Sequence, residues 1–283
     1  MPISGQTRLA AVIGDPVRHS LSPQIHNRAF TEVGLDWRYV ALPVAQGDAS
    51  DAIHAMKVLD LGGLSVTMPH KADVASAVDH ITPAAEALNS VNCVFWQDGE
   101  LWGDSTDGDG LLQAIAEHTG PNGESALDHR SVLVMGTGGA ARSIVEALGR
   151  RSQASIVVAG RRPESTTSTA KLALGASAIS MAEIVDIDSV DVVINATSVG
   201  MEGGPDPQAS PFPIDRLRPD QLVVDIVYQP RMTPLLAAAT AVGADVLPGI
   251  PMLVHQAGLA FTRWTGVQAP VEAMADAVAA EHG

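Results

Sequence analysis

The chain contains little cysteine, little basic charge and no long apolar run. Cys93 is its one cysteine, which excludes an intrachain disulfide and favours a reducing compartment. Seventeen lysines and arginines stand against 32 aspartates and glutamates, giving a formal charge of −15. This balance argues against nucleic acid binding, which needs a basic surface to release counterions, although a local cationic site could still hold a small anion.

The N-terminus lacks the charged-then-apolar order of a signal peptide, and no apolar run approaches the roughly 18 residues of a membrane helix. We therefore predict a soluble cytoplasmic protein without a membrane partner. Its length of 283 residues is enough for one large domain or two modest ones, and its hydrophobic content of 46% is typical of globular proteins.

Apolar runs alternate with amphipathic stretches, which predicts an α/β fold with parallel strands. In the first half we predict strands at residues 9–13, 37–42 and 63–66, and a hairpin of residues 91–96 and 100–103 that turns at Asp98-Gly99. Predicted helices cover residues 48–59, 70–78 and 108–118, and another begins at Ser22-Pro23 with the serine as N-cap. The polar stretch at residues 119–123 is expected to break the chain.

The second half repeats the strand–helix order more regularly. We predict strands at residues 131–135, 155–159, 191–195, 221–226 and 245–247, and helices at residues 140–148, 165–174, 234–241, 252–265 and 271–280. The expected architecture is an N-terminal α/β domain of residues 1–107 and a Rossmann-like dinucleotide-binding domain with a parallel sheet, residues 108–251. The C-terminal helices, residues 252–283, are expected to pack back on the first domain, with a cleft between the two domains.

A glycine-rich turn, Gly136-Thr137-Gly138-Gly139-Ala140-Ala141, follows the predicted strand at residues 131–135. In a dinucleotide fold the first glycine permits a tight turn and the second lets backbone N–H groups approach the pyrophosphate. A small third residue, here Ala141, lets the helix pack on the strand. Glycines also serve ordinary turns, but the strand–turn–helix context favours a dinucleotide site.

Arg161 and Arg162 end the next strand, about 20 residues further along the chain. An NAD site usually has a carboxylate there for the ribose hydroxyls, whereas arginine suits a 2′-phosphate. The alternative is that both arginines belong to a solvated loop. We predict NADP as the cofactor.

Lys71 and Asp107 are the candidate catalytic pair. Reduction of a carbonyl by hydride needs a proton donor or a positive charge at the developing oxyanion, and an aspartate can orient the lysine and bind the substrate hydroxyl. Taken alone, Lys71 would more often be a surface charge and Asp107 an N-cap. Polar residues at the ends of the predicted strands nevertheless suggest a ligand site, namely Ser20, Ser22, Thr67 and Asn92.

These motifs resemble the shikimate dehydrogenase family, in order and over nearly the whole chain. The matching stretches are residues 14–27, Lys71, Asn92, Asp107, residues 136–142, residues 195–201, residues 225–235 and residues 249–256. The resemblance implies Lys71 and Asp107 as catalytic residues. It implies substrate contacts from Ser20, Ser22, Thr67, Asn92, Tyr228 and Gln256. It implies cofactor contacts from Gly136, Gly138, Gly139, Ala140, Arg161, Arg162, Thr197, Gly249 and Met252.

The activity implied by this resemblance is NADP-dependent, reversible reduction of 3-dehydroshikimate to shikimate in aromatic amino acid biosynthesis. Alternatives are a quinate or aminoshikimate dehydrogenase, or a non-catalytic metabolite sensor. Two serines, Ser65 and Ser105, stand where the family usually has asparagine. These two differences bear on which substrate is used more than on the type of reaction. No histidine pair has metalloprotease spacing, so no metal is expected. The protein is expected to be a monomer or a homodimer.

Overall fold

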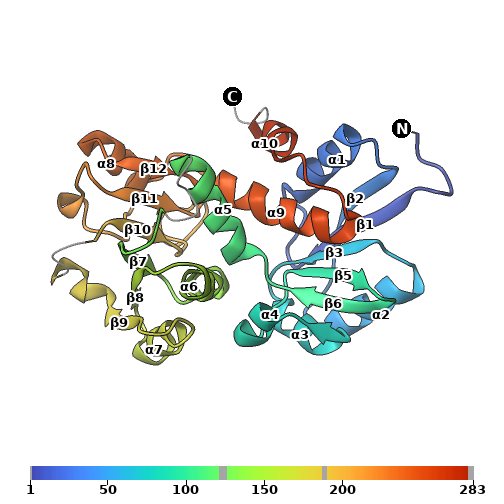
Figure 1. The fold of residues 1–283 in the computed structure, drawn as a ribbon, viewed down its shortest axis with the longest axis horizontal. Helices are drawn as coiled ribbons and strands as arrows, with labels where there is room; N and C mark the ends of the chain where they lie inside the picture. Colours follow the sequence, from blue (N-terminus) through green and yellow to red (C-terminus); the bar gives the residue numbers. More distant parts are fainter. Residues whose placement is uncertain (1, 121–125, 187–189, 280–283) are drawn as a thin grey trace. The chain divides into compact units, whose positions relative to one another are not determined.

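The computed structural model describes residues 2–120, 126–186 and 190–279. The chain divides into two compact units, which are treated separately below. The first unit combines Met1–Thr106 with Val254–Gly283, and the second is Asp107–Leu253. Both are α/β units (Figure 1).

The first unit is built on a mixed six-stranded sheet in the order β2-β1-β3-β5-β6-β4. The strands are β1 (Arg8–Gly14), β2 (Trp37–Pro43), β3 (Gly63–Val66), β4 (His80–Ile81), β5 (Cys93–Gln97) and β6 (Glu100–Asp104). Strands β2, β1 and β3 run parallel, whereas β5 runs antiparallel to β3 and to β6. The predicted hairpin turn at Asp98 and Gly99 is present, with both residues at positive φ.

Helices cover both faces of this sheet. They are α1 (Ser22–Glu32), α2 (Ala49–Val58), α3 (Lys71–Ala77) and α4 (Pro83–Leu88), together with the C-terminal α10 (Val271–Ala279) and the part of α9 (Gly249–Thr265) from Val254 onward. One core packs Ile13 against Ile53 and Met56 of α2. Aromatic rings of α1, β2 and α9 also pack together, and those of Tyr39 and Trp264 are stacked.

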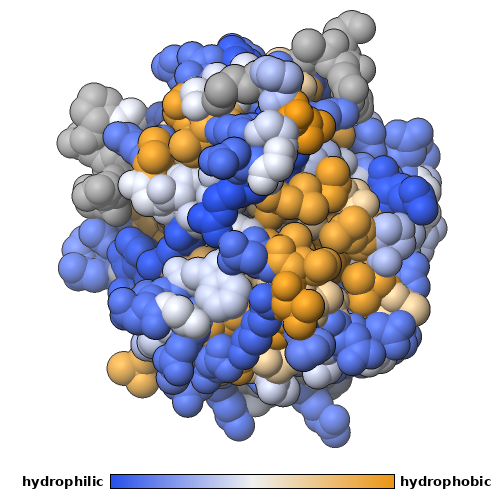
Figure 2. Space-filling model, turned by 90° about the vertical axis from the view of Figure 1, so that its right-hand side faces the viewer, coloured by the Kyte–Doolittle hydropathy of each residue, from blue (hydrophilic) through white to orange (hydrophobic). Residues whose placement is uncertain are grey.

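Helix α10 and the part of α9 from Val254 onward belong to the first unit. Trp264 of α9 donates from Nε1 to the Val94 carbonyl oxygen at 3.0 Å, and its indole lies against Gly63 of β3. Strand β2 forms an edge of the sheet, and its side chains Val40 and Leu42 are each 37% exposed. Figure 2 shows apolar surface bordered by hydrophilic side chains on one face of the molecule.

The second unit is a fully parallel six-stranded sheet in the order β12-β11-β10-β7-β8-β9. The strands are β7 (Ser131–Met135), β8 (Ser155–Gly160), β9 (Ser177–Ser180), β10 (Val192–Asn195), β11 (Leu222–Asp225) and β12 (Asp245–Leu247). This is the strand order of a dinucleotide-binding fold, with the change of direction between β7 and β10. Ligands in such folds bind beyond the carboxyl ends of those two strands.

Each face of the second sheet has its own apolar core. The helices of this unit are α5 (Asp107–Thr119), α6 (Gly139–Arg151), α7 (Pro163–Ala170) and α8 (Pro234–Val242), with short 3-10 turns at Met181–Asp186 and Ile214–Arg216. Leu111 of α5 and Ile144 of α6 pack on one face. Leu235 and Leu236 of α8 pack on the other face.

Several sequence-based expectations need correction. Strands β4 and β9 and helix α4 were not predicted, and α7 covers Pro163–Ala170 where residues 165–174 were expected. Residues 121–123 of the expected polar break, and residue 280 of the last predicted helix, lie outside the described residues. None of the helices within the described ranges has the length and apolarity to cross a membrane.

Candidate functional site

Ser20 and Ser22 lie in the segment that follows β1. Ser22 is not the N-cap that the sequence suggests, because α1 begins at Ser22 itself and its N-cap Leu21 has no side-chain cap bond. Instead the Ser20 hydroxyl oxygen accepts the Ser22 backbone N–H at 3.2 Å. The two serines are thus joined by a local turn, and the Ser22 side chain is 8% exposed.

Tyr39 of β2 lies beneath this serine turn, and it was not predicted. Its hydroxyl is buried and has no hydrogen-bond partner among the described residues, and burial raises the pKa of the phenol well above its ordinary value. His26 of α1 stacks on the Tyr39 ring at 4.4 Å between ring centroids, and burial lowers the pKa of His26 to about 3. His26 and Tyr39 therefore form a neutral, buried aromatic pair in the first unit.

Thr67 and Lys71 follow β3. The Thr67 backbone N–H donates to the Ile13 carbonyl oxygen at 2.9 Å, which joins this turn to the end of β1. Lys71 is the first residue of α3, and its own carbonyl oxygen accepts the Val91 N–H at 2.9 Å. Its side chain is partly exposed. The backbone at Lys71 is thus fixed to the segment that precedes β5.

Asn92, Thr106 and Gln256 form a buried hydrogen-bonded knot in the first unit. The Asn92 amide oxygen accepts the Thr106 N–H at 2.8 Å, and its Nδ2 donates to the Thr106 hydroxyl at 3.0 Å. The same hydroxyl donates to the Gln256 carbonyl oxygen of α9 at 3.2 Å. Asn92 and Gln256 were predicted as site residues, and Thr106, which joins them, was missed. It directly precedes Asp107 in the chain.

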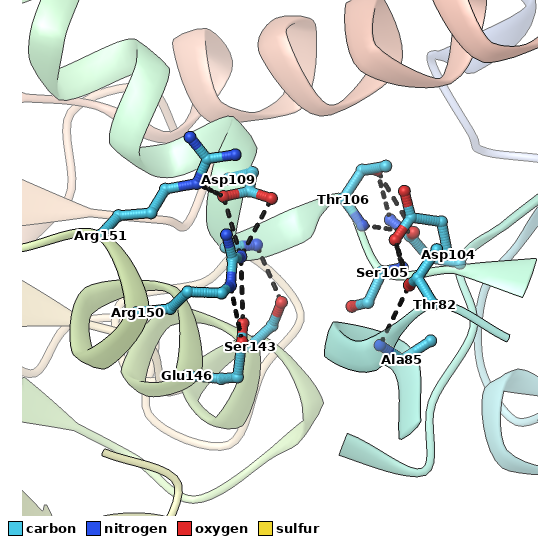
Figure 3. Close-up of polar contacts among 12 residues, drawn as sticks. Thr82, Ala85, Asp104, Ser105, Thr106, Asp109, Ser143, Glu146, Arg150 and Arg151 are labelled. Atoms are coloured by element: carbon cyan, nitrogen blue, oxygen red, sulfur yellow. Dashed lines mark hydrogen bonds and ion pairs between the residues drawn. The ribbon is translucent and has the colours of Figure 1, made fainter. Parts of the chain in front are cut away.

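Asp104 fixes the chain just before Thr106 through its carboxylate (Figure 3). Its carboxylate accepts hydrogen bonds from the Thr82 hydroxyl at 2.6 Å, the Ser105 N–H at 2.9 Å and Arg263 Nη2 of α9 at 2.9 Å. Asp104 is buried, whereas the Arg263 side chain is 48% exposed, so the ion pair is shielded from water at its carboxylate end only. The serine at position 105 therefore lies in a segment that is braced from both ends.

Asp107 begins α5 and belongs to the second unit, whereas Lys71 belongs to the first. A carboxylate in the first turn of a helix is stabilised by the helix dipole.

The glycine turn connects β7 to α6 in the second unit. Gly136 has a φ of +115°, and a Cβ atom built on it would lie 2.7 Å from the Ala196 carbonyl oxygen. Only glycine suits both the conformation and the space. The turn therefore lies against the residues that follow β10, at the change of strand direction where dinucleotides bind.

The surface of this turn suits a pyrophosphate. Gly138 and Gly139 are exposed, and no described atom lies within 4 Å of a Cβ built on either. Gly138 is the N-cap of the 13-residue helix α6, so unpaired backbone N–H groups and the helix dipole face that space. Ala140 is partly exposed in the first turn of α6, and Ala141 is fully buried, as packing of helix on strand requires.

Arg161 and Arg162 follow β8, and both side chains are exposed. Within the described ranges, neither guanidinium has an ion-pair partner. Two uncommitted cations at the end of this strand could bind a 2′-phosphate without first breaking a salt bridge.

Thr197 is fixed by a polar network at the ends of β10 and β11. The Asn195 amide oxygen accepts the Thr197 hydroxyl at 2.7 Å and its N–H at 2.9 Å. The Asn195 Nδ2 donates to Asp225 Oδ1 at 2.9 Å, and Asp225 Oδ2 accepts the Thr233 hydroxyl at 2.7 Å. Asn195, Asp225 and Thr233 are all fully buried, and sequence analysis had given Asn195 and Asp225 no structural role.

Tyr228, Gly249 and Met252 complete the predicted set. Tyr228 follows β11, and burial raises the pKa of its phenol. Gly249 begins α9 and lies against the Ile226 and Val227 carbonyl oxygens. The Met252 side chain is 8% exposed and packs in the apolar core of the second unit.

Metal ligands were not predicted at this site. Within residues 2–120, 126–186 and 190–279, no three histidine, cysteine, aspartate or glutamate side chains are grouped so as to hold a metal ion.

Three segments of the chain match known protein families. Residues 12–94 match the shikimate dehydrogenase substrate binding domain, residues 118–231 match shikimate / quinate 5-dehydrogenase, and residues 249–279 match the shikimate 5'-dehydrogenase C-terminal domain.

Full-length relatives agree with these matches. A protein of Citrifermentans bemidjiense named shikimate dehydrogenase (NADP(+)) is 41% identical over 99% of this chain and 97% of its own length. The crystal structure of shikimate 5-dehydrogenase from Listeria monocytogenes, in complex with shikimate and NAD, is 31% identical with a TM-score of 0.91, covering 98% of both chains. The Thermus thermophilus enzyme in complex with NADP(H) and shikimate is 32% identical with a TM-score of 0.85, covering 96% of this chain and 99% of its own. The chain therefore belongs to the shikimate dehydrogenase family.

Proposed function

We propose that this chain catalyses the NADP-dependent, reversible reduction of 3-dehydroshikimate to shikimate. The similarity that carries this proposal is 41% identity, along nearly the whole length, to a protein named shikimate dehydrogenase (NADP(+)). The chain keeps a lysine at position 71 and an aspartate at position 107, as a catalyst would need and a ligand sensor would not. A quinate or aminoshikimate dehydrogenase and a non-catalytic sensor are the alternatives that an assay must separate.

The first unit would bind the substrate. Ser20 and Ser22 would hold the ring carboxylate, because their hydroxyl groups can donate to it from one turn. Thr67, Asn92 and Gln256 would bind the ring hydroxyls, and the Thr106 knot fixes two of these three residues relative to each other. Tyr228 of the second unit would add a further hydrogen bond.

Lys71 would donate a proton to the carbonyl oxygen during reduction, or stabilise its developing negative charge. In the reverse direction the same amine would accept the hydroxyl proton as the carbonyl forms. Asp107 would accept a hydrogen bond from the reacting or the neighbouring hydroxyl and orient the lysine. When bound, NADPH supplies the hydride for this chemistry.

The second unit would hold the dinucleotide. Gly138, Gly139 and Ala140 would bind the pyrophosphate through backbone N–H groups, while Gly136 makes the turn possible. Arg161 and Arg162 would bind the 2′-phosphate. Thr197, Gly249 and Met252 would lie toward the nicotinamide end.

A spectrophotometric assay that follows reduced nicotinamide tests the function directly. Shikimate, quinate and aminoshikimate are each combined with NADP and with NAD, and we expect the highest kcat/KM for shikimate with NADP. A higher kcat/KM for quinate with NAD would overturn the assignment in favour of the quinate enzyme. Tight binding of shikimate without turnover would instead identify a sensor.

Changing Arg161 to serine is expected to raise the KM for NADP about tenfold and to leave the KM for NAD nearly unchanged. A charge-assisted hydrogen bond contributes roughly 1.5–3 kcal/mol, and NAD lacks the phosphate that would receive it. Arg216→Ser, at another exposed arginine of the same unit, serves as the control. Equal losses for both cofactors would show that Arg161 does not read the 2′-phosphate.

A further inference from the structure

Helix α5, which begins with the candidate catalytic residue Asp107, is held at its first turn by α6. The Gly108 backbone N–H donates to the Ser143 hydroxyl of α6 at 2.8 Å. The first N–H groups of a helix have no partner within the helix, so this hydroxyl satisfies a donor that would otherwise be left buried and unpaired. Ser143 is 3% exposed, which keeps water from replacing it.

The two helices touch closely at this point. A Cβ atom built on Gly108 would collide with the Ser143 carbonyl oxygen and lie 2.8 Å from the Ala147 Cβ. Only a residue without a side chain lets α5 approach so near. The residue next to Asp107 is therefore fixed both by a hydrogen bond and by backbone contact.

Charged side chains also join the same two helices at Asp109, the residue after Gly108 (Figure 3). Arg150 Nη2 lies 3.1 Å from each Asp109 carboxylate oxygen, and Arg151 Nε lies 2.6 Å from Oδ1. Arg150 also donates from Nε to Glu146 at 2.8 Å. Asp109 is held between two arginines, so rotation or sliding of α5 on α6 would break several contacts at once.

Helix α6 also begins at the glycine turn, with Gly138 as its N-cap and Ser143 little more than one turn further on. One rigid helix thus carries the pyrophosphate-binding turn at its end and the support of Asp107 on its side. We propose that Ser143 is a positioning residue, which fixes the Asp107 carboxylate relative to the bound cofactor through the Gly108 N–H. This inference rests on the proposed dehydrogenase function.

The expected consequence is a loss in kcat without loss of cofactor binding. A misplacement of about 1 Å at a reacting centre can lower a rate by up to roughly a hundredfold. Ser143→Ala leaves the Gly108 N–H unpaired and lets the first turn of α5 move, so we expect kcat for shikimate oxidation to fall about tenfold. The dissociation constant of NADPH, measured by fluorescence titration, should change less than about twofold, because the backbone N–H groups of the glycine turn are intact.

A double-mutant cycle separates positioning from a general structural effect. In an Asp107→Asn background, where the carboxylate is already gone, Ser143→Ala should lower kcat by less than about twofold. Ser152→Ala is the matched control, since it removes another hydroxyl of this region, one that donates to the Leu148 carbonyl oxygen at 2.8 Å, and it should leave kcat unchanged. Ser143→Thr keeps the hydroxyl and should restore most of the rate.

If Ser143→Ala does not fold, Asp109→Asn provides the same test, because it removes the ion pairs to Arg150 and Arg151 and should show the same dependence on Asp107. Normal kcat in the variant that folds, or an equal loss with and without the Asp107 carboxylate, would overturn the inference and leave the proposed function standing. Absence of shikimate turnover by the unchanged protein would overturn both.

Discussion

Replacing Lys71 by alanine is expected to lower kcat by roughly 10²–10⁴-fold while the KM for shikimate changes only a few fold. The reason is that the ammonium group interacts most strongly with the oxygen as it gains negative charge, so its loss falls on the transition state more than on the ground state. The measurement is the steady-state rate of shikimate oxidation with NADP, at saturating concentrations of both. A variant with near-normal kcat would remove Lys71 from the mechanism.

Two further variants sharpen this result. Lys71→Arg keeps the positive charge but cannot release a proton at ordinary pH, so it should recover activity only if Lys71 acts by charge alone. Lys57→Ala removes a lysine of the same unit, which pairs with Asp79 at 2.7 Å on the surface, and should leave kcat unchanged. A similar loss in the Lys57 variant would point to general damage to the unit.

Strands and helices with strong apolar patterns could be predicted from the sequence. The predicted strands at residues 131–135 and 155–159 agree with β7 and β8 to within one residue. Both are nearly continuous apolar runs, which are typical of parallel strands covered on both faces. Strand β9, Ser177–Ser180, has little apolar character at the sheet edge, and β4 is two residues long. Both exist through pairing with a neighbour, which no local pattern reveals.

The candidate site shows the same difference between residues in continuous motifs and residues that meet only through folding. Lys71, Asp107 and the glycine turn lie in continuous motifs, so the sequence could nominate them. Thr106 was not nominated, because its partners Asn92 and Gln256 lie 14 and 150 residues away. Ser143 lies 35 residues from Gly108, and only the packing of α5 on α6 joins them. Ser22 was misread as a cap because its residue type fits, whereas α1 begins at Ser22 itself and the N-cap position is Leu21.

The second large expected effect is on protein stability, and it concerns the hydrogen-bond network around Asp225. This fully buried carboxylate accepts hydrogen bonds from Asn195 Nδ2 at 2.9 Å, the Thr233 hydroxyl at 2.7 Å and the Val227 N–H at 3.0 Å. Those donors belong to the end of β10, the start of α8 and the segment that leads to Tyr228. One side chain therefore organises the loops that would surround the nicotinamide.

Asp225→Ala is expected to destabilise the protein by roughly 3–5 kcal/mol, because it leaves three donors buried without an acceptor. Asp225→Asn should cost less than about 1 kcal/mol at neutral pH. Its amide oxygen can accept from Asn195 and Val227, and its Nδ2 can donate to the Thr233 oxygen once the hydroxyl rotates. Urea denaturation of the three proteins measures the difference, and equal losses in both variants would mean that the charge itself holds the network.

The pH dependence of stability tests the same carboxylate in a second way. Burial raises the pKa of Asp225 above its ordinary value, although the hydrogen bonds from Thr233, Val227 and Asn195 oppose the shift. The folded state therefore binds the proton more tightly than the unfolded state does, so this group stabilises the fold fully below its ordinary pKa. That contribution is lost as the pH rises from the ordinary pKa through the raised one.

Asp225→Asn cannot titrate, so the Tm of the unchanged protein should fall relative to the Tm of the variant over this acidic window. Above this window the two Tm curves should run parallel. Parallel curves through the whole acidic range would show that Asp225 keeps an ordinary pKa and that its hydrogen bonds compensate fully for burial.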